Sequence, residues 1–399
     1  MTPQPLLDLT PLVRLLLAGI LLAVAPLVYV GWRNRRSTPV KRLHALTLLT
    51  LFLTFDLVIF GAFTRLTDSG LGCPDWPGCY GSASPIGAQA QIAVEQSAMP
   101  SGPVTTRKAW IEMVHRYLAT GVGVLITIIA VANWRAPVRA VSRQHWWATA
   151  TLIWVCIQGA FGALTVTMKL FPAIVTLHLL GALFLLALLT VQVVQQAAAD
   201  RANANTSDDH RRDPAPRIEK HSLNRTLAWI VLTALTAQIA LGGWVSTNYA
   251  VLACNEFPTC QGSWWPAMNF EQGFQIWRKL GFTGGGDIIG FEALTAIHYA
   301  HRTMAVLVVL LTGAWVLVLN GSKVTRSASR WIALLIGLQF LTGLGNVLFD
   351  WPLLVALLHT AGAAALVVAV TWVLTAVHLE GNQNKFRRDP KLNVSSLQP

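Results

Sequence analysis

Apolar residues fill long stretches of this chain, and shorter polar segments separate them. Each stretch is about 20 residues long, the length that a helix needs to cross the hydrocarbon core of a bilayer. The stretches also lack the broad polar face of a surface helix. They predict nine transmembrane helices, at residues 12–32, 43–64, 112–134, 146–168, 172–196, 225–247, 294–319, 330–348 and 353–378. The predicted fold class is an all-α polytopic membrane protein.

The polar segments differ in charge from one side of the predicted membrane to the other. Segments after odd-numbered helices, together with the C-terminal tail, contain most of the 30 Lys and Arg residues. The positive-inside rule places these segments in the cytoplasm, with the N-terminus outside and the C-terminus inside. The net charge of +12 therefore reflects topology, and no nucleic-acid partner is predicted. A composition that is 54% hydrophobic and 12% charged agrees with a protein embedded in the lipid bilayer.

The chain contains an internal repeat with an offset of 181 residues. The segment LGCPDWPGCYG at 71–81 matches LACNEFPTCQG at 252–262. The same offset relates Gly61 to Gly242, Gln158 to Gln339, Gly162 to Gly343, and His178 to His359. Each copy holds four predicted helices, an even number, so both copies insert the same way up as parallel repeats. We expect two tandem four-helix bundles in pseudo-two-fold arrangement.

This repeat predicts five regions along the chain. They are an appended N-terminal transmembrane helix with its cytoplasmic loop at 1–42, a first four-helix bundle at 43–197, a cytoplasmic linker at 198–223, a second four-helix bundle at 224–380 and a cytoplasmic tail at 381–399. The appended helix has no counterpart in the second copy.

Histidine is costly at membrane depth, so histidines within predicted helices are informative. His115 matches His301, and His178 matches His359, which gives each copy one histidine on its second helix and one on its fourth, near the outer end. Two imidazoles that face each other across a bundle can bind heme iron from both sides. Zinc is a weaker alternative, because a closed structural site needs four converging ligands. The role of His298, three residues before His301, stays open.

The polar residues around these histidines differ between the two copies. Glu112 lies three residues before His115, where a carboxylate can take a proton or stabilise positive charge, although it can also simply favour the helix start. Arg65 has no counterpart in the second copy and is a candidate for contact with a heme propionate or with the cysteine loop. Arg116 and Arg302 follow the histidines at the outer rim, where they can contact heme propionates or extend toward the membrane surface. The first copy is therefore predicted to carry the chemistry.

Four of the cysteines form two pairs on the predicted outer, oxidising side of the membrane. We expect disulfides between Cys73 and Cys79 and between Cys254 and Cys260, each closing a loop over the outer end of its bundle. For the first pair, a redox role is the alternative. Cys156 lies within a predicted helix, where we expect it to pack.

The run GAFTRLTDSGLGCPDWPGCYG, the EMVHR of Glu112 to Arg116, the HYAHR of His298 to Arg302 and the two LH-containing helices resemble the heme A synthase family. The resemblance covers roughly residues 43–378. It implies a multi-pass enzyme of the inner (cell) membrane that oxidises the C8 methyl of heme O to the formyl group of heme A for terminal oxidases. The extra first helix departs from the simpler eight-helix pattern.

The resemblance also implies roles for the candidate residues. His115 and His178 would hold the iron of the substrate heme O, Glu112 would be the catalytic carboxylate, and His301 and His359 would hold a heme b. The first bundle would then be the substrate and catalytic half, and the second the heme b half. Expected partners are the heme O synthase farnesyltransferase and cytochrome oxidase assembly, and an oligomer is possible.

Two other functions agree with part of the pattern. A non-catalytic di-heme cytochrome that transfers electrons from quinol would use the same four histidines, but it would not explain a carboxylate in only one copy. A transporter built from parallel repeats would need a polar path at the midplane, where Asp56 is the one charged residue. We rank the transporter last.

Overall fold

The structure is a computed structural model that describes residues 10–135, 144–205, 221–321 and 325–388. Its elements are α1 (Thr10–Arg33), α2 (Pro39–Leu66), η1 (Pro85–Ala88), α3 (Gln89–Ala98), α4 (Thr106–Arg135), α5 (Gln144–Thr167), α6 (Pro172–Asn205), α7 (His221–Thr247), η2 (Ala250–Leu252), α8 (Phe270–Gly273), α9 (Phe291–Asn320), α10 (Arg326–Leu348) and α11 (Leu353–Arg388). Nine helices in this described part are long and apolar enough to cross a membrane. The predicted all-α polytopic fold is confirmed.

The two halves keep the same backbone even where their residues differ. The turn between α5 and α6 has positive φ at Lys169 and Leu170, and the turn between α10 and α11 has positive φ at Asp350 and Trp351, which lie 181 residues further on. Left-handed backbone is uncommon for residues with a side chain. Its recurrence at matched positions indicates that the second half retains the geometry of the first.

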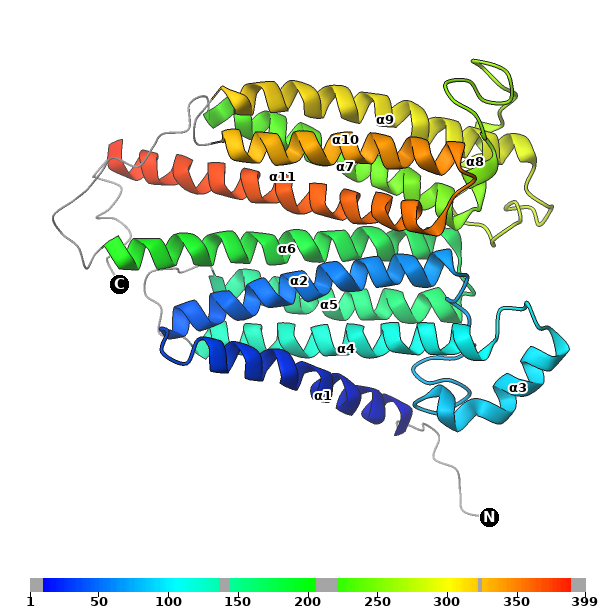
Figure 1. The fold of residues 1–399 in the computed structure, drawn as a ribbon, viewed down its shortest axis with the longest axis horizontal. Helices are drawn as coiled ribbons and strands as arrows, with labels where there is room; N and C mark the ends of the chain where they lie inside the picture. Colours follow the sequence, from blue (N-terminus) through cyan, green and yellow to red (C-terminus); the bar gives the residue numbers. More distant parts are fainter. Residues whose placement is uncertain (1–9, 136–143, 206–220, 322–324, 389–399) are drawn as a thin grey trace, which may run out of the picture.

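Each half is a ring of four helices. In the first half α2, α4, α5 and α6 each pack against two neighbours in the ring, and in the second half α7, α9, α10 and α11 do the same. The helices on opposite corners of a ring, α4 with α6 and α9 with α11, are not among the strongly packed pairs of the described residues. Figure 1 shows the two groups side by side. The interior of each ring thus lies between opposite helices that do not touch closely.

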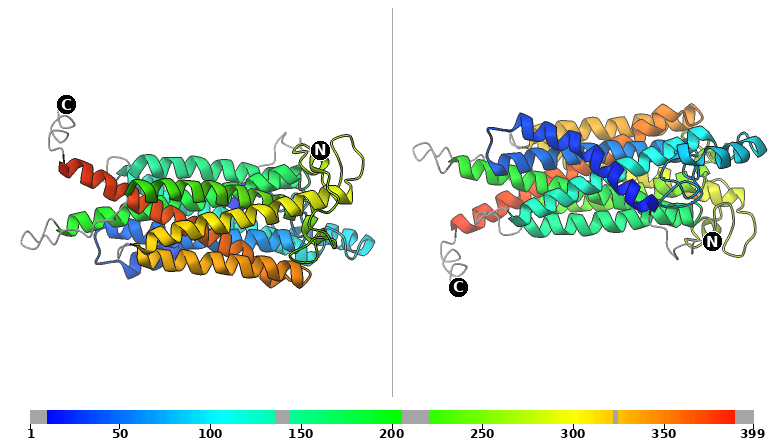
Figure 2. Two further views of the ribbon diagram at one scale, coloured as in Figure 1. Left: turned by 90° about the horizontal axis from the view of Figure 1, so that it is seen from above. Right: turned by 90° about the horizontal axis from the view of Figure 1, so that it is seen from below.

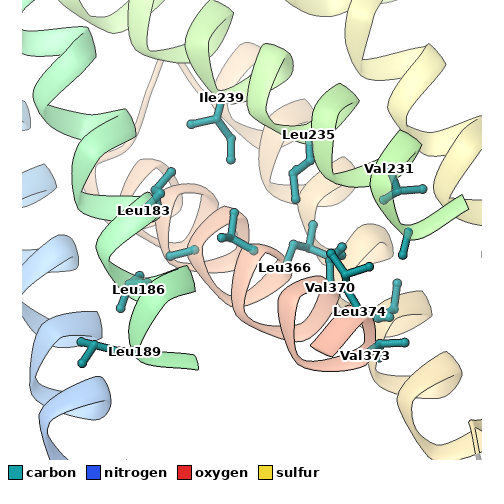
Figure 3. Close-up of a cluster of buried hydrophobic side chains, with 14 of the residues drawn as sticks. Leu183, Leu186, Leu189, Val231, Leu235, Ile239, Leu366, Val370, Val373 and Leu374 are labelled. Carbon is teal, nitrogen blue, oxygen red and sulfur yellow. The ribbon is translucent and has the colours of Figure 1, made fainter. Parts of the chain in front are cut away.

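The apolar core lies between the two rings. α6 packs on both α7 and α11, and α11 also packs on α2. Figure 3 shows buried leucine, isoleucine and valine side chains from α6, α7 and α11 meeting there. In a bilayer this contact is held by close packing of side chains, because lipid tails are as apolar as leucine. The two halves therefore form one packed unit.

The connections that follow α2 and α7 lie at the same end of the molecule. Figure 1 shows α3 and α8 at this end, and Figure 2 shows α3 projecting beyond the ends of the long helices. α1 packs mainly on α4, on the side of the first ring that is away from the second half. The appended helix therefore leaves the interface between the halves untouched. The boundaries of the five sequence regions stay predictions.

Candidate functional site

The first pair of histidines projects from opposite corners of the first ring. His115 lies on α4 and His178 on α6. Each imidazole lies against a glycine of a neighbouring helix. A Cβ added to Gly61 would be 3.1 Å from Nε2 of His115, and one added to Gly162 would be 3.3 Å from Cε1 of His178. The missing side chains leave room for the imidazoles, which are partly exposed.

The second pair repeats this arrangement. His301 on α9 and His359 on α11 lie on opposite corners of the second ring. Their glycines are Gly242 and Gly343, where an added Cβ would be 2.9 Å from Cε1 of His301 and 3.2 Å from Cε1 of His359. The structure therefore places two of the four predicted histidines in each half, on opposite helices of its ring and each against a glycine of a neighbouring helix.

The side chains that hold the imidazoles differ between the halves. In the second half, Nε2 of Gln238 lies 3.1 Å from Nδ1 of His301, and the hydroxyl of Thr342 lies 2.9 Å from Nδ1 of His359. In the first half, Nε2 of Gln158 lies 3.0 Å from Nδ1 of His178.

His115 differs from the other three. Its ring lies parallel to the ring of Phe60, with 6.3 Å between centroids, and no described side chain hydrogen-bonds to it. Hydrogen bonds to a ligand's second nitrogen fix its orientation. The second pair is therefore held more firmly than the first.

These residues fit one heme in each half. Heme needs an axial nitrogen on each face of the porphyrin and space between the two ligands, and each pair consists of two imidazoles on opposite helices. The described residues include no group of three or more His, Cys, Asp or Glu that could hold a metal ion. A closed zinc site, which needs four ligands, finds no support among them.

Glu112 is buried beside the first pair. One carboxylate oxygen lies 2.5 Å from Nη2 of Arg116, in an ion pair whose side chains are 4% and 7% exposed. The other oxygen accepts a hydrogen bond of 2.8 Å from the Cys73 N–H. A buried carboxylate needs such partners, because an isolated one would lose its hydration without compensation. Glu112 thus joins α4 to the start of the cysteine loop.

Both predicted disulfides are formed, Cys73 to Cys79 and Cys254 to Cys260. In the first loop, Nη1 of Arg116 donates to the carbonyl oxygens of Asp75 and Gly78, at 3.0 and 2.6 Å. Cys156 is a free cysteine and is exposed, so the expectation that it packs inside the protein is wrong.

The second loop repeats these contacts with other residues. Arg302 donates to the carbonyl oxygens of Pro258 and Thr259, at 3.1 and 3.2 Å. His298 is buried, and its Nδ1 accepts the Cys254 N–H at 3.3 Å, as Glu112 accepts the Cys73 N–H. The structure therefore gives His298 a contact with the loop. Arg116 and Arg302 both bind loop carbonyls.

Arg65 lies where the two halves meet. Nη2 of Arg65 donates to the carbonyl oxygen of Ser246 at 2.5 Å, and its guanidinium lies 4.3 Å from the ring centroid of Tyr249. The Tyr249 hydroxyl donates to Asp68 at 2.6 Å, and Asp68 pairs with Arg65 at 3.2 Å. Ser246 and Tyr249 are the residues 181 positions after Arg65 and Asp68. These four residues, the junction cluster, link matched positions of the two copies.

Comparison with known sequences identifies the protein family. Residues 17–371 match the COX15-CtaA family, described as cytochrome oxidase assembly protein. The chain belongs to this family.

Curated relatives of the family are similar along most of the chain. The Heme A synthase of Shewanella oneidensis is 33% identical over 82% of this chain and 93% of its own length. The Heme A synthase of Caulobacter vibrioides is 28% identical over 85% of this chain and 96% of its own length. That of Alkalihalophilus pseudofirmus is 24% identical over 84% of this chain and 96% of its own length. This member of the COX15-CtaA family therefore matches its relatives over almost their whole length.

Two residues of this family member that contact the imidazoles were missed in the sequence. Gln238 and Thr342 have Leu57 and Phe161 at the matching positions of the first copy, so the repeat gave no signal for them. Gln158 and Gln339 did repeat, and each donates from Nε2 to the backbone carbonyl of its histidine. The repetition of these glutamines could have indicated a contact with the histidines, but it did not show that the bond goes to the backbone carbonyl.

Proposed function

We propose that this chain is a heme A synthase, which oxidises the C8 methyl group of heme O to the formyl group of heme A. The observation that carries the proposal is a buried carboxylate beside only one of two matched histidine pairs. Glu112 is present in the first half, and His298 occupies its place in the second. A cytochrome that only carries electrons would have no need of this difference.

Each histidine pair receives its own role in this proposal. His115 and His178 hold the substrate heme O, and His301 and His359 hold a resident heme b. When bound, heme b supplies one-electron transfer. The contacts of Gln238 and Thr342 with the imidazole Nδ1 atoms favour permanent binding in the second half. The His115 ring, which lacks such a bond among the described residues, suits a substrate that must enter and leave.

Glu112 is the proposed catalytic carboxylate. Its burial places a negative charge next to His115 in a region from which water is largely excluded, where a charge acts strongly. The carboxylate can stabilise positive charge that develops at the methyl group or take the proton released there. Arg116 keeps the carboxylate in place through the ion pair and holds the loop above it.

The proposed location is the inner membrane, with both cysteine loops outside and the C-terminus in the cytoplasm. The basic segments support this orientation through the positive-inside rule. The product, heme A, is then formed near the outer face. A membrane-impermeant maleimide should label a cysteine at exposed Ser101 in intact cells and leave one at exposed Ser327 unlabelled.

The test is the conversion of heme O by the full chain and by Glu112→Gln. Purified wild-type protein supplied with heme O should yield heme A, measured by chromatography of the extracted hemes. Glu112→Gln should reduce the yield by roughly 100-fold or more while both hemes stay bound, because a positioned acid–base group contributes that much. Glu95→Gln changes an exposed carboxylate on α3 and serves as the matched control.

Two outcomes would contradict the proposal. A wild-type protein that contains heme b but never converts heme O would favour the electron-carrying cytochrome. Normal conversion by Glu112→Gln would remove Glu112 from the catalytic role and leave the two histidine pairs without a reacting group.

A further inference from the structure

The arginines that follow the two outer histidines have different electrostatic surroundings. In the first half, Arg116 and Glu112 form a buried ion pair, so their charges cancel. In the second half, His298 occupies the place of the carboxylate. Because Nδ1 of His298 accepts a backbone hydrogen bond, the ring carries at most one proton, on Nε2, and is neutral. His298 thus accepts the N–H of its cysteine loop as Glu112 does, but it contributes no negative charge.

Arg302 is left without a carboxylate partner. It donates to two backbone carbonyls, its guanidinium lies 5.5 Å from the ring centroid of Phe257, and its Nη1 is buried without a hydrogen-bond partner. Neither of the two ion pairs found in the described residues includes it. The positive charge of Arg302, next to His301 in the chain, is therefore not neutralised by direct contact.

The acidic residue in each cysteine loop does not remove this difference. Glu256 accepts hydrogen bonds from the Gly262 N–H and the Thr259 hydroxyl. Asp75 occupies the matching position of the first loop and accepts the Gly81 N–H at 2.8 Å. Both loop carboxylates are therefore occupied by groups of their own loops, and neither of the two ion pairs of the described residues includes them.

A second arginine at the outer end of the second half is buried and also lacks a carboxylate partner among the described residues. Arg278 is 3% exposed and donates to the Asn248 side-chain oxygen at 2.5 Å and to the Phe282 carbonyl oxygen at 3.1 Å. Both acceptors are neutral, and its Nε is buried without a partner. The first half, in contrast, has its buried arginine paired. The two halves therefore differ in whether the buried arginine at this end has a carboxylate partner.

Uncompensated positive charge near a heme favours the reduced iron, which carries one positive charge fewer, and buried charges act over longer distances than exposed ones. We propose that Arg302, left unneutralised because His298 replaces the carboxylate, raises the reduction potential of the heme held by His301 and His359. The inference rests on the proposed function only in that each histidine pair holds a heme.

The test is a redox titration of the heme b in the second half, followed by its absorbance in the purified full chain. His298→Glu restores the ion pair with Arg302 and should lower the midpoint potential. His298→Gln is the matched control, because it keeps a neutral acceptor for the Cys254 N–H, and its potential should stay at the wild-type value. Arg302→Gln removes the cation and should lower the potential in the same direction as His298→Glu.

Equal shifts in His298→Glu and His298→Gln would overturn the inference, because they would show an effect of packing rather than of charge. No shift in His298→Glu would overturn it as well.

If His298→Glu does not retain heme, Glu112→Gln gives the reciprocal test. This variant leaves Arg116 unpaired and should raise the reduction potential of the heme held by His115 and His178. An unchanged potential there would also contradict the inference. These potentials do not depend on heme A formation, so a failure of the proposed function is seen separately.

Discussion

At the scale of single residues, the most restrictive positions in the two rings are glycines. Each of the four candidate ligands lies against one, and an added Cβ would come within 2.9 to 3.3 Å of the imidazole. Contacts this short force the ring to move. An imidazole that has moved cannot keep both its hydrogen bond and its direction toward the iron. Glycine at these positions is thus explained by close approach of a side chain.

Gly343→Val should therefore remove the heme of the second half. The added side chain would push against His359, and overpacking of this kind costs about 1–3 kcal/mol. The measurement is the ratio of heme to protein in the purified chain, which should fall by about one heme per chain. Gly337→Val lies on the same helix, α10, with nothing within 4 Å of the added Cβ, and should keep the full heme content. Equal heme loss in both variants would contradict this explanation.

The polar partners of the second-half imidazoles give another prediction at this scale. Thr342→Val removes the hydroxyl that lies 2.9 Å from Nδ1 of His359 while keeping the shape of the side chain. Loss of such a partner weakens binding roughly 10- to 100-fold, so the heme should dissociate faster. The rate of heme transfer to an excess of a heme-scavenging protein measures this. Thr360→Val, whose hydroxyl bonds only to the backbone of its own helix, should not change the rate.

At the scale of elements, each cysteine loop is a short closed unit placed over the end of its ring. Two contacts attach the first loop to α4: the carboxylate of Glu112 accepts the Cys73 N–H, and the guanidinium of Arg116 donates to the loop carbonyls. A disulfide that closes so few residues stabilises a fold by about 2 kcal/mol in the chain-entropy account. The contacts with α4 keep the loop in position independently of the disulfide.

We therefore expect the first disulfide to contribute to stability and not to the reaction. The double variant Cys73→Ser and Cys79→Ser should unfold at a lower temperature, but the fraction that retains both hemes should form heme A at the wild-type rate. The matched variant Cys254→Ser and Cys260→Ser should show a similar loss of stability. If the first double variant holds both hemes and yet makes no heme A, the cysteines take part in the chemistry.

The long helices were predictable from the sequence, and the contacts between them were predictable only in part. Runs of apolar residues identify a membrane helix directly, because its length is set by the bilayer. The repeat further predicted both disulfides. The contact of Arg65 with Ser246 could not be inferred, because an internal repeat does not show which matched residues of its two copies lie next to each other. Gln238 and Thr342 were missed because the matching positions of the first copy hold apolar residues.

At the scale of the whole molecule, the two halves are joined by an apolar core and by the junction cluster of Arg65, Asp68, Ser246 and Tyr249. The core fills most of the interface, between α6, α7 and α11 (Figure 3). The junction cluster lies at the ends of α2 and α7, on the side of the cysteine loops. Burial raises the pKa of Tyr249, and the hydrogen bond to Asp68 acts in the same direction against the charge of Arg65. The hydroxyl therefore stays protonated at neutral pH and donates to Asp68.

The junction cluster should make the two halves energetically coupled, and a double-mutant cycle on Arg65→Ala and Tyr249→Leu measures this. The guanidinium of Arg65 lies over the Tyr249 ring near the surface, where a cation–π contact is worth about 0.5–1 kcal/mol. The double variant should therefore lose less free energy of unfolding in mixed micelles than the sum of the two single variants, by about that amount. A control cycle of Arg65→Ala with Tyr29→Leu, an exposed residue of α1, should be additive because the two residues share no partner. Additivity in both cycles would mean that the contact between Arg65 and Tyr249 does not couple the two halves.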